Sequence, residues 1–309
     1  MKRVVIHKYN LLVFLFFIGV TLSVLSTSGQ KNQHEYSISC GGGVSAFFYQ
    51  PHVKNSNSIG FYGDAAVGFT GFFSPQWGIH TGLGLGLNNV SVKVKELNTI
   101  TPKQIDRNNF PFDLYTTLHD YQENHQIISL YIPLMLQFQT AQEQNRNWTK
   151  GKKAGYYVMG GVKALLLVSN KHEAKVKSLY NAAYYPEFDN WAATQIFAGL
   201  SKFDGNNTDG NLKLNAMISF AFETGLKWRI GKNTFLYSGV FFDCGLNDPF
   251  KNNRQPFSLY IYAEKLEHFT LLSISKRMHL INTGIKLRLA FIKATPEFAC
   301  PYQGRVRNK

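Results

Sequence analysis

The sequence predicts an all-β chain, folded as an eight-stranded antiparallel transmembrane β-barrel with long extracellular loops. Three observations predict this fold. They are an N-terminal export signal, eight segments in which apolar residues alternate with small or polar ones, and connections that alternate between short and long. Apart from the export signal, the chain has no run of about 18 consecutive apolar residues. Any crossing of a membrane therefore has to be made by strands.

Residues 1–29 have the composition and order of a cleaved signal peptide. Basic residues within the first eight positions are followed by an apolar run, Leu11–Leu25, and then by small residues around Ser28. An uncleaved anchor is the alternative, but this apolar run is short for a helix that has to cross about 30 Å of hydrocarbon. We expect residues 30–292 to form the barrel in the bacterial outer membrane and 293–309 to form a basic periplasmic tail.

The composition excludes several other classes of protein. The chain has 25 Phe, 16 Tyr and 26 Gly, and a formal net charge of +14. Nucleic-acid binding would fit that charge, but an exported chain does not meet nucleic acid, and its basic residues are mostly dispersed. Cys40, Cys244 and Cys300 leave one thiol unpaired and match no metal-site spacing, so we expect neither a disulfide scaffold nor a metal site.

The first three predicted strands are Tyr36–Phe48, Ile59–Phe73 and Trp77–Leu87. In the first strand, apolar side chains occupy the even positions, and Ser or Gly occupies most of the odd ones. In the other two, apolar side chains occupy the odd positions, and the inward set includes Asp64 and His80. Every second side chain of a strand points to the same face, so each segment presents one apolar face to lipid.

Three further strands are predicted at Ile128–Phe138, Tyr156–Val168 and Leu214–Ile230. The last of these has the clearest alternation, with Leu, Ile, Phe and Trp on one face and Asn, Ser, Glu, Lys and Arg on the other. Tyr156–Val168 has the weakest, because both of its faces become apolar towards the end. Pro133 lies inside an alternating segment, although proline is confined to edge strands in most sheets.

The series ends with Leu236–Leu246 and Ile281–Phe291. Around the two shortest connections, 74–76 and 231–233, the apolar positions have the same parity on both arms, as cross-strand partners in a hairpin require. A soluble β-sandwich is also built from alternating strands, but we expect its strands to be shorter and its outer face to be charged.

The long connections are predicted to be extracellular loops, opposite short periplasmic turns and both termini. They comprise residues 88–127, 169–213 and 247–280. The second is rich in Tyr, Phe and Trp, which serve well as contact residues, and loops of this length are uncommon without a role. A compact cap folded over the mouth of the barrel is the alternative.

This orientation places an aromatic residue at the predicted periplasmic end of seven of the eight strands. Aromatic rings are favoured at membrane interfaces, so we interpret these residues as a periplasmic girdle. Its members are Tyr36, Phe73, Trp77, Phe138, Tyr156, Trp228 and Phe291.

The inward positions of the predicted strands carry both acids and bases. A narrow eight-stranded barrel is filled by its own side chains, and an unpaired charge there is costly. We therefore expect a salt-bridge network that plugs and staples the barrel, with an acid–base site as the alternative. The predicted members are Asp64, His80, Lys163, Glu223, Lys227, Arg229, Asp243, Lys286 and Arg288.

Enzymes built on such barrels place their reactive residues at the extracellular rim. His119, Asp120 and His125 lie near the return of one long connection, and Asp243 and Asp248 near the start of another. Because no nucleophile is positioned with them, we predict no catalytic site and no cofactor.

Four parts of the chain share features with a known group: Ala65–Gly71 into Trp77–Leu87, Leu130–Leu136, Gly160–Lys163 and Gly239–Asp248. They resemble the outer-membrane β-barrels of Bacteroidetes, grouped as PorT-like or OmpA-like barrels. An apolar strand with an embedded Ile-Pro and a late aromatic-Asp-x-Gly-Leu-Asn strand carry the likeness. Departures are Cys244, where the family tends to have an aromatic residue, and the tail beyond the last strand.

The resemblance implies an outer-membrane barrel and, for some relatives, a part in protein secretion. We expect a monomer that contacts outer-membrane lipid and other envelope or secretion proteins, but no nucleic acid. The predicted role is structural, or a surface interaction through the extracellular loops. An accessory component of an outer-membrane secretion system is the first alternative, and an outer-membrane enzyme is the second.

Overall fold

The computed structural model describes residues 34–50, 56–106, 108–140, 154–196, 199–211, 214–231, 233–249, 261–262, 265–266 and 277–292. The predicted signal peptide and the predicted tail lie outside these residues, as does most of the third predicted loop. Every element in the described part is a β-strand. None of the described residues belongs to a helix that is long and apolar enough to cross a membrane.

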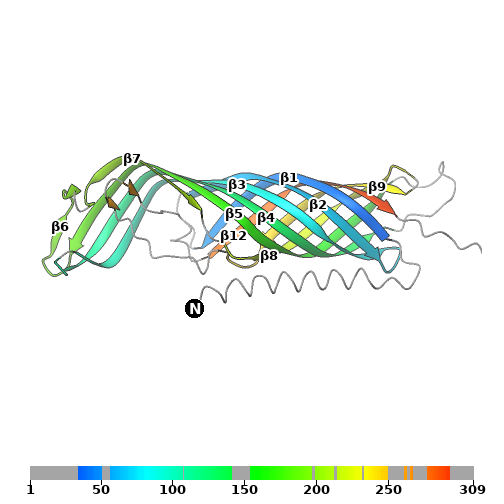
Figure 1. Ribbon diagram of the computed structural model, residues 1–309, viewed down its shortest axis with the longest axis horizontal. Helices are drawn as coiled ribbons and strands as arrows, with labels where there is room; N and C mark the ends of the chain where they lie inside the picture. The colour runs from blue at the N-terminus through cyan, green and yellow to red at the C-terminus, as the bar shows by residue number, and fades with distance from the viewer. Residues whose placement is uncertain are drawn as a thin grey trace, which may run out of the picture.

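Eight strands form a closed antiparallel barrel, shown lengthwise in Figure 1. Each strand pairs with two neighbours in the order β4-β3-β2-β1-β12-β9-β8-β5, and pairing of β4 with β5 closes the ring. Each of the eight predicted segments lies on one of these strands, which confirms the predicted fold class. The strands are β1 (His34–Gln50), β2 (Ser56–Phe72), β3 (Trp77–Ile105), β4 (Pro111–Gln139), β5 (Ala154–Tyr185), β8 (Met217–Arg229), β9 (Thr234–Gly245) and β12 (Arg277–Ile292).

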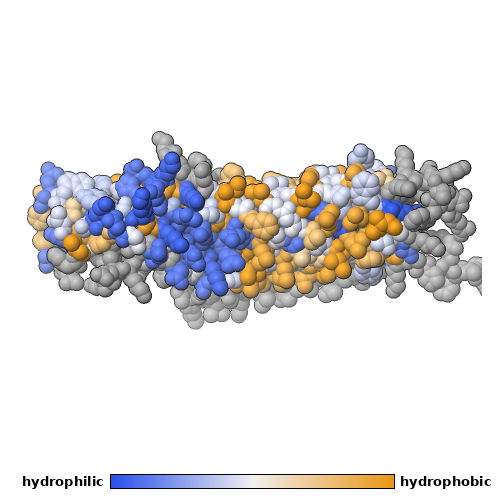
Figure 2. Space-filling model, turned by 90° about the horizontal axis from the view of Figure 1, so that it is seen from above, coloured by the Kyte–Doolittle hydropathy of each residue, from blue (hydrophilic) through white to orange (hydrophobic). Residues whose placement is uncertain are grey.

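The outward positions of the barrel form an apolar surface. Ile59 is 65% exposed and Leu85 57% exposed, whereas the side chains that alternate with them point inward and are small or polar. Figure 2 shows this surface in orange on one face of the molecule. Because exposed apolar side chains at alternate positions are what lipid covers in a membrane barrel, we call this surface the apolar belt.

Three strands continue far past the apolar belt. β3, β4 and β5 contain 29, 29 and 32 residues, and their pairing is nearly continuous to the tips of the β3–β4 hairpin and of β5. The short strands β6 (Asn190–Ala192) and β7 (Lys202–Asn211) pair with the far part of β5. We call this sheet the extension; it forms the left part of Figure 1.

Residues 88–127 and 169–213, expected as loops, are therefore mostly strands. The prediction marked strands by outward apolar residues, and these stop at the edge of the apolar belt. Beyond that edge most outward positions are polar, although Ile100 and Ile105 are exposed, while inward residues such as Val92 and Val94 stay buried and continue the alternation. Of residues 247–280, the described part includes a small hairpin of β10 (Ile261–Tyr262) and β11 (Lys265–Leu266).

The inside of the barrel is packed along its length. At the end with the short β2–β3 and β8–β9 turns, which we call the turn end, Met135, Tyr157, Phe235 and Tyr237 form one buried cluster. A larger buried cluster lies where the barrel continues into the extension, a region that we call the neck. It includes Phe47, Val90, Val92, Leu118, Tyr121, Ile127, Tyr131, Leu165, Leu179, Met217 and Leu280. Charged side chains are packed among and between these two clusters.

Candidate functional site

Charged side chains of both signs are packed inside the barrel between the turn end and the neck. Four carboxylates and four cations are buried there, none more than 8% exposed. They come from six of the eight barrel strands, because each strand turns every second side chain inward. We call this set the lumen network; it consists of Glu35, Asp64, Glu223 and Asp243 with Lys163, Lys227, Lys286 and Arg288.

One part of the lumen network lies at the turn end. Lys227 Nζ lies 2.6 Å from Glu35 Oε1 and also donates a hydrogen bond to Gln139 Oε1 at 2.9 Å. The other Glu35 oxygen accepts a hydrogen bond from the Tyr237 hydroxyl at 2.5 Å. Lys227 Nζ also lies 4.3 Å from the centre of the Phe235 ring, within the range of a cation–π contact. The ammonium group is thus surrounded by acceptors and aromatic faces.

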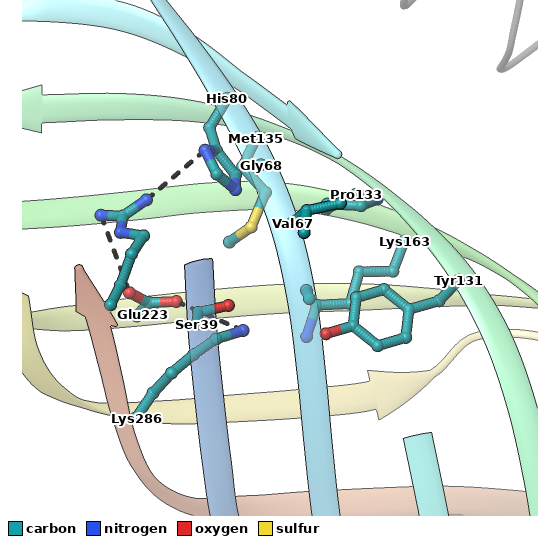
Figure 3. Close-up of a pocket in the computed structure, with 12 residues that line it drawn as sticks. Ser39, Val67, Gly68, His80, Tyr131, Pro133, Met135, Lys163, Glu223 and Lys286 are labelled. Carbon is teal, nitrogen blue, oxygen red and sulfur yellow. Dashed lines mark hydrogen bonds and ion pairs between the residues drawn. The ribbon is translucent and has the colours of Figure 1, made fainter. Parts of the chain in front are cut away.

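The centre of the lumen network is arranged around Glu223. Its carboxylate accepts a hydrogen bond from the Tyr157 hydroxyl at 2.9 Å and lies 3.9 Å from both Lys286 and Arg288. The guanidinium of Arg288 lies 4.1 Å from the centre of the Tyr237 ring. Figure 3 shows Glu223, Lys286 and His80 converging from different strands on the same interior space.

The part nearest the extension contains two ion pairs. Asp64 accepts a hydrogen bond from the Tyr131 hydroxyl and lies 3.3 Å from Lys286 Nζ. Lys163 Nζ lies 2.8 Å and 2.6 Å from the two oxygens of Asp243. Glycine at an inward position provides the room: a Cβ atom at Gly84 would lie 2.3 Å from the Tyr131 ring.

The packing leaves little open space in the lumen. The hollow lined by His80, Tyr131, Lys163, Glu223 and Lys286 has room for about one water molecule. Each carboxylate of the lumen network contacts at least one cation of the same network. Pairing of this kind offsets the cost of removing charges from water, and removal of one partner exposes the other to that cost.

The structure brings eight of the nine sequence-predicted lumen residues together. Asp64, Lys163, Glu223, Lys227, Asp243, Lys286 and Arg288 belong to the lumen network, and His80 lies beside it. His80 Nδ1 lies 2.9 Å from Thr70 Oγ1 and 3.4 Å from Arg288 Nη1. Arg229 is half-buried at the turn end, where its Nε donates to the carbonyl oxygen of Gly231 at 3.3 Å.

The sequence reasoning missed Glu35. This residue precedes Tyr36, the first outward residue of the first predicted strand, so extending the alternation by one position would have placed Glu35 inside. It also missed the part played by inward tyrosines, whose hydroxyl groups donate to three of the four carboxylates. The position of a tyrosine along its strand does not identify its carboxylate partner, because these contacts join strands that are distant in sequence.

A second buried polar cluster lies in the neck, beyond the lumen network. His125 Nε2 lies 3.0 Å from Glu123 Oε1, and both side chains are fully buried. The Tyr121 hydroxyl donates to Glu123 Oε2 at 2.9 Å, and the His172 ring is stacked 6.3 Å from the His125 ring. Among the described residues, no group of three His, Cys, Asp or Glu side chains is placed to hold a metal ion.

The rim residues singled out from sequence do not converge. His125 points inward, whereas His119 and Asp120 are exposed, and Asp120 lies 3.5 Å from Lys177 on the outer face. The reason is local: Asp120 has a positive φ of 49°, and the buried face of β4 changes from even to odd positions there. Asp243 is part of the lumen network, far from these residues along the barrel.

The seven predicted girdle residues lie at the turn end of the barrel. Tyr36 pairs with Phe291 in the register of β1 and β12, and Trp77 with Phe138 in that of β3 and β4. All of the seven are exposed except Phe138, which is half-buried with its ring centre 4.9 Å from that of Trp77. Cys40 is exposed on the apolar belt, and Cys244 is partly exposed.

Aromatic side chains also gather at the far end of the extension. The ring of Trp191 lies 4.8 Å from that of Tyr115 and 4.9 Å from that of Tyr184, measured between centres. Trp191 is 54% exposed. The Tyr184 hydroxyl donates to Asp189 Oδ1 at 2.7 Å, and this hydrogen bond raises the pKa of the phenol. We call Tyr115, Tyr184 and Trp191 the distal aromatic group.

No family model matches the chain, and no curated protein matches it. Solved structures of outer-membrane proteins are similar to the chain over most of its length, at low sequence identity. The outer membrane protein OprG from Pseudomonas aeruginosa is 10% identical, with 85% of this chain and 96% of that chain covered and a TM-score of 0.32. Ail, the attachment invasion locus protein of Yersinia pestis, is 10% identical, with coverages of 84% and 99% and a TM-score of 0.26. The outer membrane protease OmpT of Escherichia coli is 10% identical, with coverages of 87% and 100% and a TM-score of 0.28.

Proposed function

We propose that this chain is a non-conducting outer-membrane barrel that holds a rigid β-sheet at the cell surface, where the distal aromatic group contacts another macromolecule. Closed β-barrels with an apolar outer band reside in outer membranes. The N-terminal segment also has the composition of an export signal. The turn end then faces the periplasm, and the extension projects outward.

The observation that carries this proposal is the continuity of β3, β4 and β5 from the apolar belt into the extension. A barrel that served only to span the membrane would have no use for strands of this length. Hydrogen bonding between neighbouring strands keeps the extension stiff, so its tip is held at a set distance from the lipid. The exposed Trp191, supported by the half-buried Tyr115 and Tyr184, supplies a large contact area at low cost in conformational entropy.

The lumen supports a structural role rather than transport or catalysis. An eight-stranded barrel is narrow enough for side chains to fill it, and this one contains four cations, four carboxylates and several tyrosines. Each carboxylate is already engaged by a cation of the lumen network. We infer that the network plugs the barrel and fastens its strands together, and that the protein is not an enzyme.

Photo-crosslinking on intact cells tests the surface contact. A photoreactive residue at Trp191 should form an adduct with a macromolecule, and one at Thr140, an exposed position at the turn end, should not form that adduct. Tyr115→Ala, which removes a ring packed against position 191, should weaken the adduct. Ile105→Ala, at a 65% exposed position, is the matched control and should leave it unchanged. The absence of a specific adduct at position 191 would contradict the proposal.

The resemblance to PorT-like barrels of Bacteroidetes keeps an accessory role in protein secretion as the second candidate. The strand with an embedded Ile-Pro, at Ile132 and Pro133, and the late strand around Asp243 carry that resemblance. A deletion strain distinguishes the two roles. Under the surface-contact proposal its secreted proteins stay unchanged, whereas their loss would favour the secretion role.

A further inference from the structure

The apolar belt has a sharp edge on the three long strands. Leu87 is 53% exposed and Ile128 36% exposed, and the two pair in the same row of the sheet. In the next outward row of the register, Asn89 pairs with Gln126, and Gln126 with Lys171. The outer face therefore changes from apolar to polar within one row, and Figure 2 shows the same abrupt change on one face. This row marks the end of the apolar belt on these strands.

Lysines are frequent on the outer face beyond this edge, among amide and acidic side chains. Lys93 on β3 and Lys175 on β5 both pair with Gln122 on β4, which lies between them. Strands are about 4.8 Å apart, so the backbones of these two lysines are about 10 Å apart. We call Lys93, Lys95, Lys171 and Lys175 the basic band; all four are exposed.

The four ammonium groups of the basic band form no ion pair within the described part of the chain. Three exposed carboxylates lie beside the band: Glu173 between Lys171 and Lys175, Asp209, which pairs with Glu173 in the register, and Glu96 next to Lys95. Two other exposed lysines of the extension do have carboxylate partners. Lys177 lies 3.5 Å from Asp120, and Lys202 lies 3.6 Å from Asp204. The basic band is thus positioned to attract anions from outside the chain.

The height of the basic band above the lipid tails indicates which anions these are. Successive outward residues of a strand are about 6.6 Å apart, which for a strand tilted by about 40° corresponds to about 5 Å of height. Lys171 then lies one outward row, or about 5 Å, above the edge row, and Lys93 and Lys175 lie three rows above it, at a mean height of about 15 Å. Because a row that crosses tilted strands runs obliquely to the membrane, the heights of Lys93 and Lys175 differ by about 6 Å. The headgroup layer of a phospholipid leaflet is only about 5–8 Å thick, so the upper lysines lie beyond it. Lipopolysaccharide has phosphorylated sugars at that height.

We propose that the basic band binds the phosphate groups of lipopolysaccharide molecules packed against the apolar belt. Two features of the molecule support it: the positive charge is complementary to the phosphates, and the band is continuous with the lipid-facing surface. Binding there would hold the base of the extension against the lipid. The inference uses the outer-membrane location but not the contact proposed for the distal aromatic group, so the experiments on the two can fail independently.

Titration of the purified full chain in detergent with purified core-containing lipopolysaccharide tests the proposal. The double variant Lys93→Gln/Lys175→Gln should bind about 30-fold more weakly than the unchanged chain, the equivalent of about 1 kcal/mol per lysine. The matched control, Lys177→Gln/Lys202→Gln, removes the same charge from lysines that already face carboxylates and should bind normally. Heat-modifiable migration on gels checks that all three proteins remain folded.

Two further probes separate the possible sources of phosphate. Vesicles of phosphatidylglycerol should bind the unchanged chain and Lys93→Gln/Lys175→Gln equally, because the upper lysines lie beyond that headgroup layer. Inorganic phosphate at millimolar concentration should not displace lipopolysaccharide. Equal binding of lipopolysaccharide by all variants, equal losses in both double variants, a matching loss on phosphatidylglycerol, or displacement by inorganic phosphate would each overturn the proposal.

Discussion

Lys163 and Asp243 form a two-oxygen ion pair across an intervening strand. The two residues are 80 positions apart in sequence, on β5 and β9, and Lys163 Nζ lies 2.6 Å from Asp243 Oδ2. β8 runs between those strands, so the pair bridges the lumen side of three neighbouring strands. Such a pair fastens the barrel wall from inside, and it provides a direct test of the lumen network.

Asp243→Ala should destabilise the folded barrel by about 3–5 kcal/mol, because it leaves the buried ammonium of Lys163 without its carboxylate. The free energy of unfolding in urea, measured in lipid vesicles, checks the loss. The double change Lys163→Met/Asp243→Leu removes both charges and should recover most of the stability. A single variant as stable as the unchanged chain would contradict the role assigned to the pair.

Glu35→Gln should also destabilise the barrel, because Lys227 then loses its ionised partner at the turn end. The expected loss is about 2–4 kcal/mol, less than for Asp243→Ala, since Gln139 Oε1 still accepts a hydrogen bond from Lys227. Unfolding followed by tryptophan fluorescence measures the loss. Arg229→Gln is the matched control at the same end, and it should have little effect because Arg229 is only half-buried.

Gly84→Ala should destabilise the barrel, because the added methyl group would lie 2.3 Å from the buried Tyr131 ring. Overpacking of this kind costs about 1–3 kcal/mol. Gly160→Ala is a matched control on a neighbouring part of the sheet, where a Cβ atom meets nothing within 4 Å. Equal unfolding free energies for the two variants would contradict tight packing around Tyr131.

The protein should be electrically silent in planar bilayers, because Tyr131, Tyr157 and Tyr237 are almost completely buried in the lumen. Replacement of all three by Ala removes three rings from the lumen and should produce measurable ion conductance. Single-channel recording of the unchanged chain and the triple variant tests this, with heat-modifiable migration as the check on folding. Steady conductance through the unchanged chain would rule out a plugged barrel.

The Tyr184 phenol should ionise at higher pH than an ordinary tyrosine, because its hydrogen bond to Asp189 favours the protonated form. Any stability that this bond contributes is present at neutral pH and is lost as the pH rises through the raised pKa. Asp189→Asn should move that pKa back down. Ultraviolet difference titration of the two proteins measures the change, and superimposable curves would exclude the interaction.

Much of the fold could be predicted from alternation alone. The outward residues of each barrel strand are apolar because lipid covers them, and that requirement marks every barrel strand without knowledge of its partners. The strands of the extension were not predicted, because the prediction relied on outward apolar residues. The outer face of the extension has mostly lysine and amide side chains in place of the apolar residues that face lipid. At Asp120 a positive φ shifts the buried face of β4 by one position, so one continuous alternation does not describe that strand.

The sequence by itself determined the barrel, its eight strands and the inward direction of most of its charges, because side-chain direction in a strand depends only on position along the chain. Tertiary structure alone decided which charges meet. Lys163 reaches Asp243, and Lys227 reaches a carboxylate 192 positions away, because closure of the ring brings distant strands around one narrow space. The register between strands, which no single strand encodes, sets those distances.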